Sequence, residues 1–126
     1  MSETYDDNPV AVERKGAALV VRPREKMLRD VALRRLARSI DDASESDPGI
    51  ALVVLDLSAV AIVPSIALGL LVQTLNKCNE RQQRLKLAGV QPQIRKVLAL
   101  TRLAELFELA DSVESAVESP PARELP

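Results

Sequence analysis

Histidine is absent from this 126-residue chain, and cysteine and aromatic residues are almost absent. Without histidine, the sequence lacks the most common general base and the most common metal ligand, so we expect neither an enzyme nor a metal site. The single cysteine, Cys78, allows no internal disulfide and no cysteine-based metal cluster. Tyr5 and Phe107 are the only aromatic residues, too few to stack nucleic-acid bases. We therefore expect no cofactor.

No charge of one sign dominates, and no apolar run is long. The chain has 17 basic and 18 acidic residues and a net charge of -1, so we expect neither nucleic acid nor an anionic membrane as a partner. No apolar run approaches the roughly 20 residues that cross a bilayer. The first residues are acidic and polar, unlike a signal peptide. We therefore predict a cytoplasmic protein without direct membrane insertion.

The most apolar part of the chain lies between residues 50 and 78. Residues 50–57 are aliphatic and β-branched except for Asp56, which predicts a strand buried on both faces. A loop over residues 58–64 and a helix that begins at Ser65 follow. The core-facing positions of this helix recur at three-and-four spacing, at Ala67, Leu70, Leu71, Thr74, Leu75 and Cys78. Function in α/β proteins is common where a strand ends and a helix begins.

The remaining segments alternate between strand and helix patterns. We expect a hairpin over residues 10–21, helices over 27–42, 93–100 and 112–118, a strand over 84–89 and a short extended piece over 106–109. Asp111, with Glu114 three residues later, predicts a capping box for the last helix. This order indicates an α/β fold with a mostly parallel or mixed sheet. We expect one domain over residues 9–118, with flexible ends over 1–8 and 119–126.

Ser65 is the most informative residue of the sequence. Its position predicts an N-cap, whose hydroxyl accepts a hydrogen bond from a backbone N–H two or three residues later. The same position suits a phosphate, because free N–H groups and the helix dipole stabilise added negative charge. The two interpretations are compatible, and the spacing alone does not decide between them.

Beside Ser65, the helix carries a second stripe at Leu68, Gly69, Val72 and Asn76. If the first stripe faces the sheet, Leu68 and Val72 lie at least partly outside the core and form a small contact surface with Gly69. Glycine costs this helix about 1 kcal/mol relative to alanine, which the close approach of another chain would explain. The alternative is that the protein itself covers both sides of the helix, and the sequence favours neither.

Two stretches resemble a known family. Residues 53–73, VVLDLSAVAIVPSIALGLLVQ, and residues 84–117, which begin RLKLAG and end FELADSVESAV, are similar to the STAS domain of bacterial anti-sigma-factor antagonists. The resemblance covers residues 10–118 and implies a mixed sheet of four to five strands, with helices mainly on one face. Aligned through Leu68 and Gly69, the serine that is phosphorylated in the family falls on Ser65.

The resemblance also implies a function. Such antagonists bind an anti-sigma factor that is also a serine kinase, and phosphorylation of the serine ends the binding. For this chain it implies partner-binding residues at the start of the helix, namely Pro64, Ser65, Ile66, Leu68, Gly69, Val72 and Asn76. The family motif commonly reads Asp-Ser-Ser/Ala-Gly-Leu-Gly, whereas here Pro64 replaces the acid and Ala67 the glycine. The alternative is a non-phosphorylated scaffold or accessory subunit of a signalling or lipid-transport complex.

Overall fold

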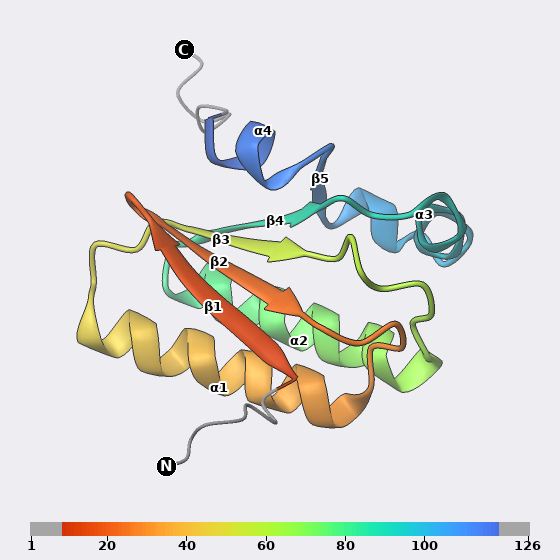
Figure 1. The fold of residues 1–126 in the computed structure, drawn as a ribbon, viewed down its shortest axis with the longest axis horizontal. Coiled ribbons are helices and arrows are strands. Elements are labelled where there is room, and N and C mark those ends of the chain that lie inside the picture. Colours follow the sequence, from red (N-terminus) through yellow and green to blue (C-terminus); the bar gives the residue numbers. More distant parts are fainter. Residues whose placement is uncertain (1–8, 119–126) are drawn as a thin grey trace.

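A computed structural model describes residues 9–118 of the protein (Figure 1). Its elements are, in order, β1 (Val10–Lys15), β2 (Ala18–Pro23), α1 (Asp30–Ser46), β3 (Leu52–Asp56), α2 (Ser65–Glu80), β4 (Arg84–Ala88), α3 (Pro92–Leu100), the 3-10 turn η1 (Leu103–Glu105), β5 (Glu108–Ala110) and α4 (Val113–Glu118). The flexible ends predicted over residues 1–8 and 119–126 lie outside the described residues and stay predictions.

The five strands form one mixed sheet in the order β1-β2-β3-β4-β5. β1 and β2 are antiparallel and form the predicted hairpin, whereas all later neighbours are parallel. Helices α1, α2 and α3 provide the three crossovers that these parallel neighbours need. The prediction of an α/β fold with a mixed sheet is confirmed.

Helices cover the two faces of the sheet unequally. α1 and α2 lie side by side over one face, and the short α4 lies over the other (Figure 1). Because side chains alternate along a strand, Val53 and Leu55 of β3 enter the main core under α1 and α2, whereas Val54 joins a smaller cluster under α4. The strand buried on both faces and the helices mainly on one face are therefore confirmed.

Helix α1 begins and ends later than predicted, at 30–46 instead of 27–42. At its start, Met27 forms an isolated parallel bridge with Ile62, and the Leu28 N–H donates to the Ile62 carbonyl at 2.9 Å. This pairing with a distant segment keeps Met27 and Leu28 out of the helix. At its end, the helix continues through residues that resemble a loop in sequence and stops before Pro48, which disfavours a helical residue in front of it.

The predicted capping box of α4 is wrong by one residue. The Ser115 N–H donates to Ser112 Oγ at 3.1 Å, and the Ser112 N–H donates to Ser115 Oγ at 3.2 Å. Ser112 thus caps the helix, and Ser115 takes the reciprocal role that was assigned to Glu114. Asp111 is exposed, and its Oδ1 lies 3.8 Å from Nη2 of Arg95.

Candidate functional site

The candidate site lies where β3 ends and α2 begins. The loop between them is held by backbone hydrogen bonds from two neighbouring segments. The Leu57 N–H donates to the Ala88 carbonyl of β4 at 2.9 Å, and the N–H groups of Ala61 and Ile62 donate to the Lys26 carbonyl at 2.7 and 3.0 Å. The position at which α2 starts is therefore fixed by the sheet on one side and by the segment before α1 on the other.

Asp56, the last residue of β3, connects the sheet to this loop. Its Oδ2 accepts a hydrogen bond from Arg22 Nε at 2.8 Å, and its Oδ1 accepts one from the Ser58 N–H at 3.1 Å. Burial alone would raise the pKa of Asp56, but the hydrogen bonds from Arg22 and Ser58 outweigh it and hold the pKa below its ordinary value. The carboxylate is thus charged at neutral pH and has a structural role.

Gly89 allows a second close contact under the loop. Its φ of +67° lies in the left-handed region, and a Cβ at this position would meet the Ser58 Cβ at 3.0 Å. The side chain of Gln91 also reaches the loop, where Nε2 donates to the Ser58 carbonyl at 2.9 Å. The turn after β4 therefore packs against the turn after β3 and is hydrogen-bonded to it.

Ser65 is the first residue of α2 and not its N-cap, so this prediction was wrong. Pro64 occupies the N-cap in an extended conformation, and the helix therefore lacks a side-chain cap. The Pro64 carbonyl accepts from the N–H groups of Ala67 and Leu68 at 2.9 and 3.2 Å. The Ser65 side chain is exposed, and no hydrogen bond joins its hydroxyl to another described residue. The hydroxyl is accessible from outside and is not needed for the helix.

The predicted partner-binding residues differ in exposure. The exposed ones are Ser65, Ile66, Gly69 and Asn76. Leu68 and Val72 are half-buried and pack against the main core, and Pro64 is half-buried as well. A Cβ added to Gly69 would meet nothing within 4 Å, so the protein does not cover the helix at this point. The opposite stripe is in the core as predicted, with Ala67, Leu71, Thr74 and Cys78 buried.

An apolar patch next to Ser65 was missed in the sequence. We define it by four residues with 41% to 61% of their surface exposed, namely Met27, Val31, Ile62 and Ile66. The bridge joins Met27 to Ile62, and the helices that carry Val31 and Ile66, α1 and α2, begin at the same end of the molecule (Figure 1). Helical spacing gives no signal for the pair Ile62 and Ile66, because Ile62 lies in the extended segment before the helix.

Cys78 is not a reactive group at this site. Burial raises the pKa of its thiol to about 11, while Arg81 opposes the rise and Asp41 adds to it. The thiol is therefore protonated at neutral pH. Between residues 9 and 118, no group of three or more cysteine, aspartate and glutamate side chains is placed to hold a metal ion. A membrane-spanning helix, long and apolar enough, is also not found in that range.

These features define an α/β domain with a mixed five-stranded sheet that presents a serine at the start of its second helix. The STAS domain model matches residues 8–116, and the chain belongs to this family. The family resemblance seen in the sequence is confirmed.

Three solved structures show the range of similar proteins. An anti-sigma factor antagonist from Mycobacterium paratuberculosis is 25% identical, with 86% of this chain and 89% of that chain covered and a TM-score of 0.69. The phosphorylated form of the Bacillus cell fate determinant SpoIIAA is 16% identical, with 86% and 96% covered and a TM-score of 0.66. A sulfate transporter family protein from Wolinella succinogenes is 16% identical, with 79% and 81% covered and a TM-score of 0.67. The latter two similarities concern the fold alone.

Proposed function

We propose that this protein is a regulatory binding module that antagonises an anti-sigma factor of the serine-kinase type. The observation that supports this proposal best is the exposed Ser65 hydroxyl beside the apolar patch. A partner that covers Ile66 and Ile62 would remove apolar surface from water and would bring Ser65 close to its own surface. Similarity to the Mycobacterium antagonist agrees with this role.

Phosphorylation of Ser65 by the bound kinase would end the complex. A phosphoserine carries about -1.5 to -2 charges at pH 7, and an apolar contact would have to remove water from them. In the free protein, the amino end of α2 would stabilise the same charge through the helix dipole. The modification therefore favours the free protein and disfavours the complex.

We propose no catalytic activity for the chain itself and a cytoplasmic location. Among the described residues, the Asp56 carboxylate is engaged by Arg22 and Ser58, and the Cys78 thiol is buried and protonated. Neither group combines accessibility with the reactivity that a nucleophile needs. The chemistry at Ser65 would come from the partner.

The test uses purified full-length chain and a kinase-type anti-sigma factor from the same cell. We expect wild type and Ser65→Ala to bind the partner equally in a pull-down, and Ser65→Glu to lose binding. With ATP, wild type should gain one phosphate by intact mass and Ser65→Ala none. Equal binding by the alanine and glutamate variants would refute the switch.

A second candidate is a scaffold or accessory subunit that is not phosphorylated. Two observations favour it: Pro64 stands where the family commonly has an acid, and the fold is shared with the Wolinella sulfate transporter family protein. This candidate predicts that Ser65→Ala and Ser65→Glu assemble alike, whereas Ile66→Asp disrupts the assembly.

A further inference from the structure

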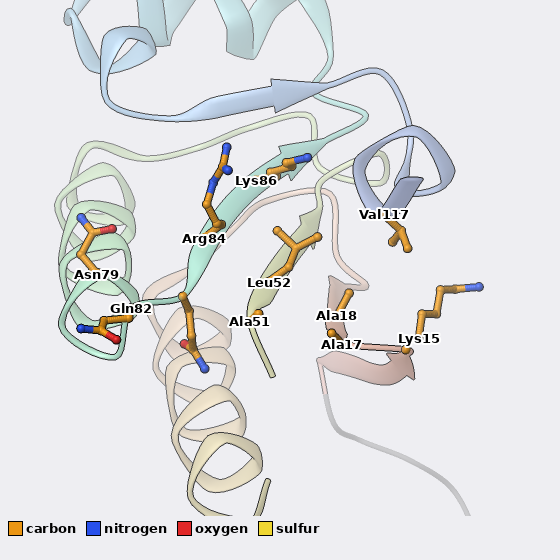
Figure 2. A pocket seen from close by; sticks show the side chains of 12 residues that line it. Lys15, Ala17, Ala18, Ala51, Leu52, Asn79, Gln82, Arg84, Lys86 and Val117 are labelled. Atoms are coloured by element: carbon orange, nitrogen blue, oxygen red, sulfur yellow. The ribbon is translucent and has the colours of Figure 1, made fainter. Parts of the chain in front are cut away.

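A cavity of about 680 Å³ lies at the end of the sheet where strands β2, β3 and β4 begin (Figure 2). Ala18, Leu52 and Arg84, the first residues of these strands, line it. The three strands are parallel. The cavity therefore lies at the opposite end of the strands from Ser65, which follows the end of β3. Its volume is within the range of small-molecule sites.

The lining of the cavity combines an apolar wall with positive charge. The apolar side chains are Ala17, Ala18, Ala51, Leu52 and Val117. Three cations, Lys15, Arg84 and Lys86, line it as well, and none of the lining residues between positions 9 and 118 is acidic. In a chain with slightly more acidic than basic residues, this is a local excess of positive charge. An anion with an apolar body is complementary to such a lining.

Lys86 is the buried cation of the cavity. It is only 6% exposed and extends from β4 toward α4 (Figure 2), where Nζ donates to the Ala116 carbonyl at 3.0 Å. None of the ion pairs between described residues includes Lys86. An ammonium has three N–H donors, and a buried charge is costly without a counter-charge. A ligand carboxylate would supply both an acceptor and that charge.

The other two cations already have partners. Arg84 Nε donates to Glu108 Oε2 at 2.8 Å, and Lys15 lies 3.6 Å from Glu13 at the outer rim. Among the described residues, Lys86 is therefore the one cation of the cavity without a counter-charge, which favours a ligand with a single negative charge. The described part of the lining also has no aromatic side chain on which a nucleobase could stack.

We propose that this cavity binds a small amphipathic monocarboxylate, with its carboxylate on Lys86 and its apolar body against Leu52 and Val117. The site is separate from the partner-binding surface at Ser65, and no part of the proposal depends on that surface.

The test titrates sodium octanoate into the ¹⁵N-labelled full chain and follows backbone amide shifts. Octanol has the same number of carbon atoms as octanoate but no charge, and acetate has the carboxylate without the long alkyl group. We expect saturable shifts with octanoate at Gly16, Ala18 and Ala51, and binding at least about tenfold weaker with octanol, because the charged hydrogen bond is lost. Absence of saturable shifts with octanoate would overturn the proposal.

Two variants separate the head group from the apolar wall. Lys86→Met keeps the length of the side chain and should weaken octanoate binding about tenfold while octanol binding is unchanged. Lys96→Met, on the exposed face of α3, is the matched control and should bind as wild type. Ala51→Phe fills the cavity from its exposed rim and should weaken both ligands. If Lys86→Met or the filled variant binds octanoate as wild type does, the assignment is wrong.

Discussion

Arg22 of β2 and Asp56 of β3 are joined across neighbouring parallel strands by a hydrogen bond of 2.8 Å from Nε to Oδ2. The pair lies one residue beyond the Val21–Leu55 register position, at the point where the sheet ends. The second oxygen of the same carboxylate holds the Ser58 N–H. Asp56 therefore fixes the loop that leads to Ser65 relative to strands β2 and β3.

Replacement of Asp56 by asparagine should destabilise the fold by about 1–3 kcal/mol at pH 7, because two hydrogen bonds lose a charged acceptor. The pKa of Asp56 is lowered in the folded protein. Its contribution is therefore present above the ordinary aspartate pKa of about 3.9 and is lost as the pH falls through the lower folded value. Urea unfolding of both proteins at pH 7 and near pH 3 checks this. An equal difference at both pH values would contradict it.

A Cβ at Gly89 should be strongly unfavourable. Gly89→Ala places a side chain at a φ of +67°, which costs about 1–2 kcal/mol for a non-glycine residue, and it also crowds Ser58. We expect a lower midpoint in urea and altered amide shifts in the loop over 57–64. Gly49→Ala, at a glycine without positive φ, is the control and should be milder. If the stability of Gly89→Ala is unchanged, the loop over 57–64 can move aside at little cost, and the prediction is wrong.

Gly69→Ala should have the opposite effect on stability. The added methyl group meets nothing within 4 Å, and alanine is favoured over glycine in a helix by about 1 kcal/mol. We expect a more stable protein in urea unfolding. If a partner chain packs closely against this part of α2, the same variant should bind the partner more weakly in a pull-down. A loss of stability would mean that the helix surface is covered after all.

Ile66→Asp should separate binding from folding. Ile66 is exposed, so its replacement should change the free energy of unfolding by no more than about 0.5 kcal/mol while it removes partner binding. Leu100→Asp, at an apolar position on α3 that is even more exposed, is the control and should keep binding. Calorimetry of binding together with urea unfolding gives both quantities. Binding losses of equal size in the two variants would exclude the apolar patch as the contact.

The Cys78 thiol should react slowly with a disulfide reagent at pH 8 in the native protein. It is buried and its pKa is raised to about 11, and only the thiolate reacts. In urea above the unfolding midpoint, the reaction should become fast. A spectroscopic thiol assay checks this, and fast reaction of the native protein would mean that the end of α2 opens readily.

Periodicity predicted the parts of the fold that depend on burial. The apolar run of β3 and the stripe from Ala67 to Cys78 indicated which faces are covered, because alternation and helical spacing depend directly on what packs where. The hairpin and the order of strands and helices followed from the same patterns. The family motif also directed attention to Ser65, whose exposure the structure then showed.

Features that depend on contacts between distant segments were not predictable in the same way. The start of α1 is set by the bridge from Met27 to Ile62, a pair separated by a whole helix and strand. The same bridge assembles the apolar patch, so the patch was missed with it. The cap of α2 was assigned to Ser65 because serine is a good cap, yet the extended Pro64 ends the loop one residue earlier.

The outer side of β1 is an edge of the sheet described over residues 9–118. Glu13, Arg14 and Lys15 are exposed along its second half, and charged residues on an edge strand oppose strand addition from a neighbouring molecule. The charged half of β1 thus disfavours fibrous association of copies of the chain along this edge.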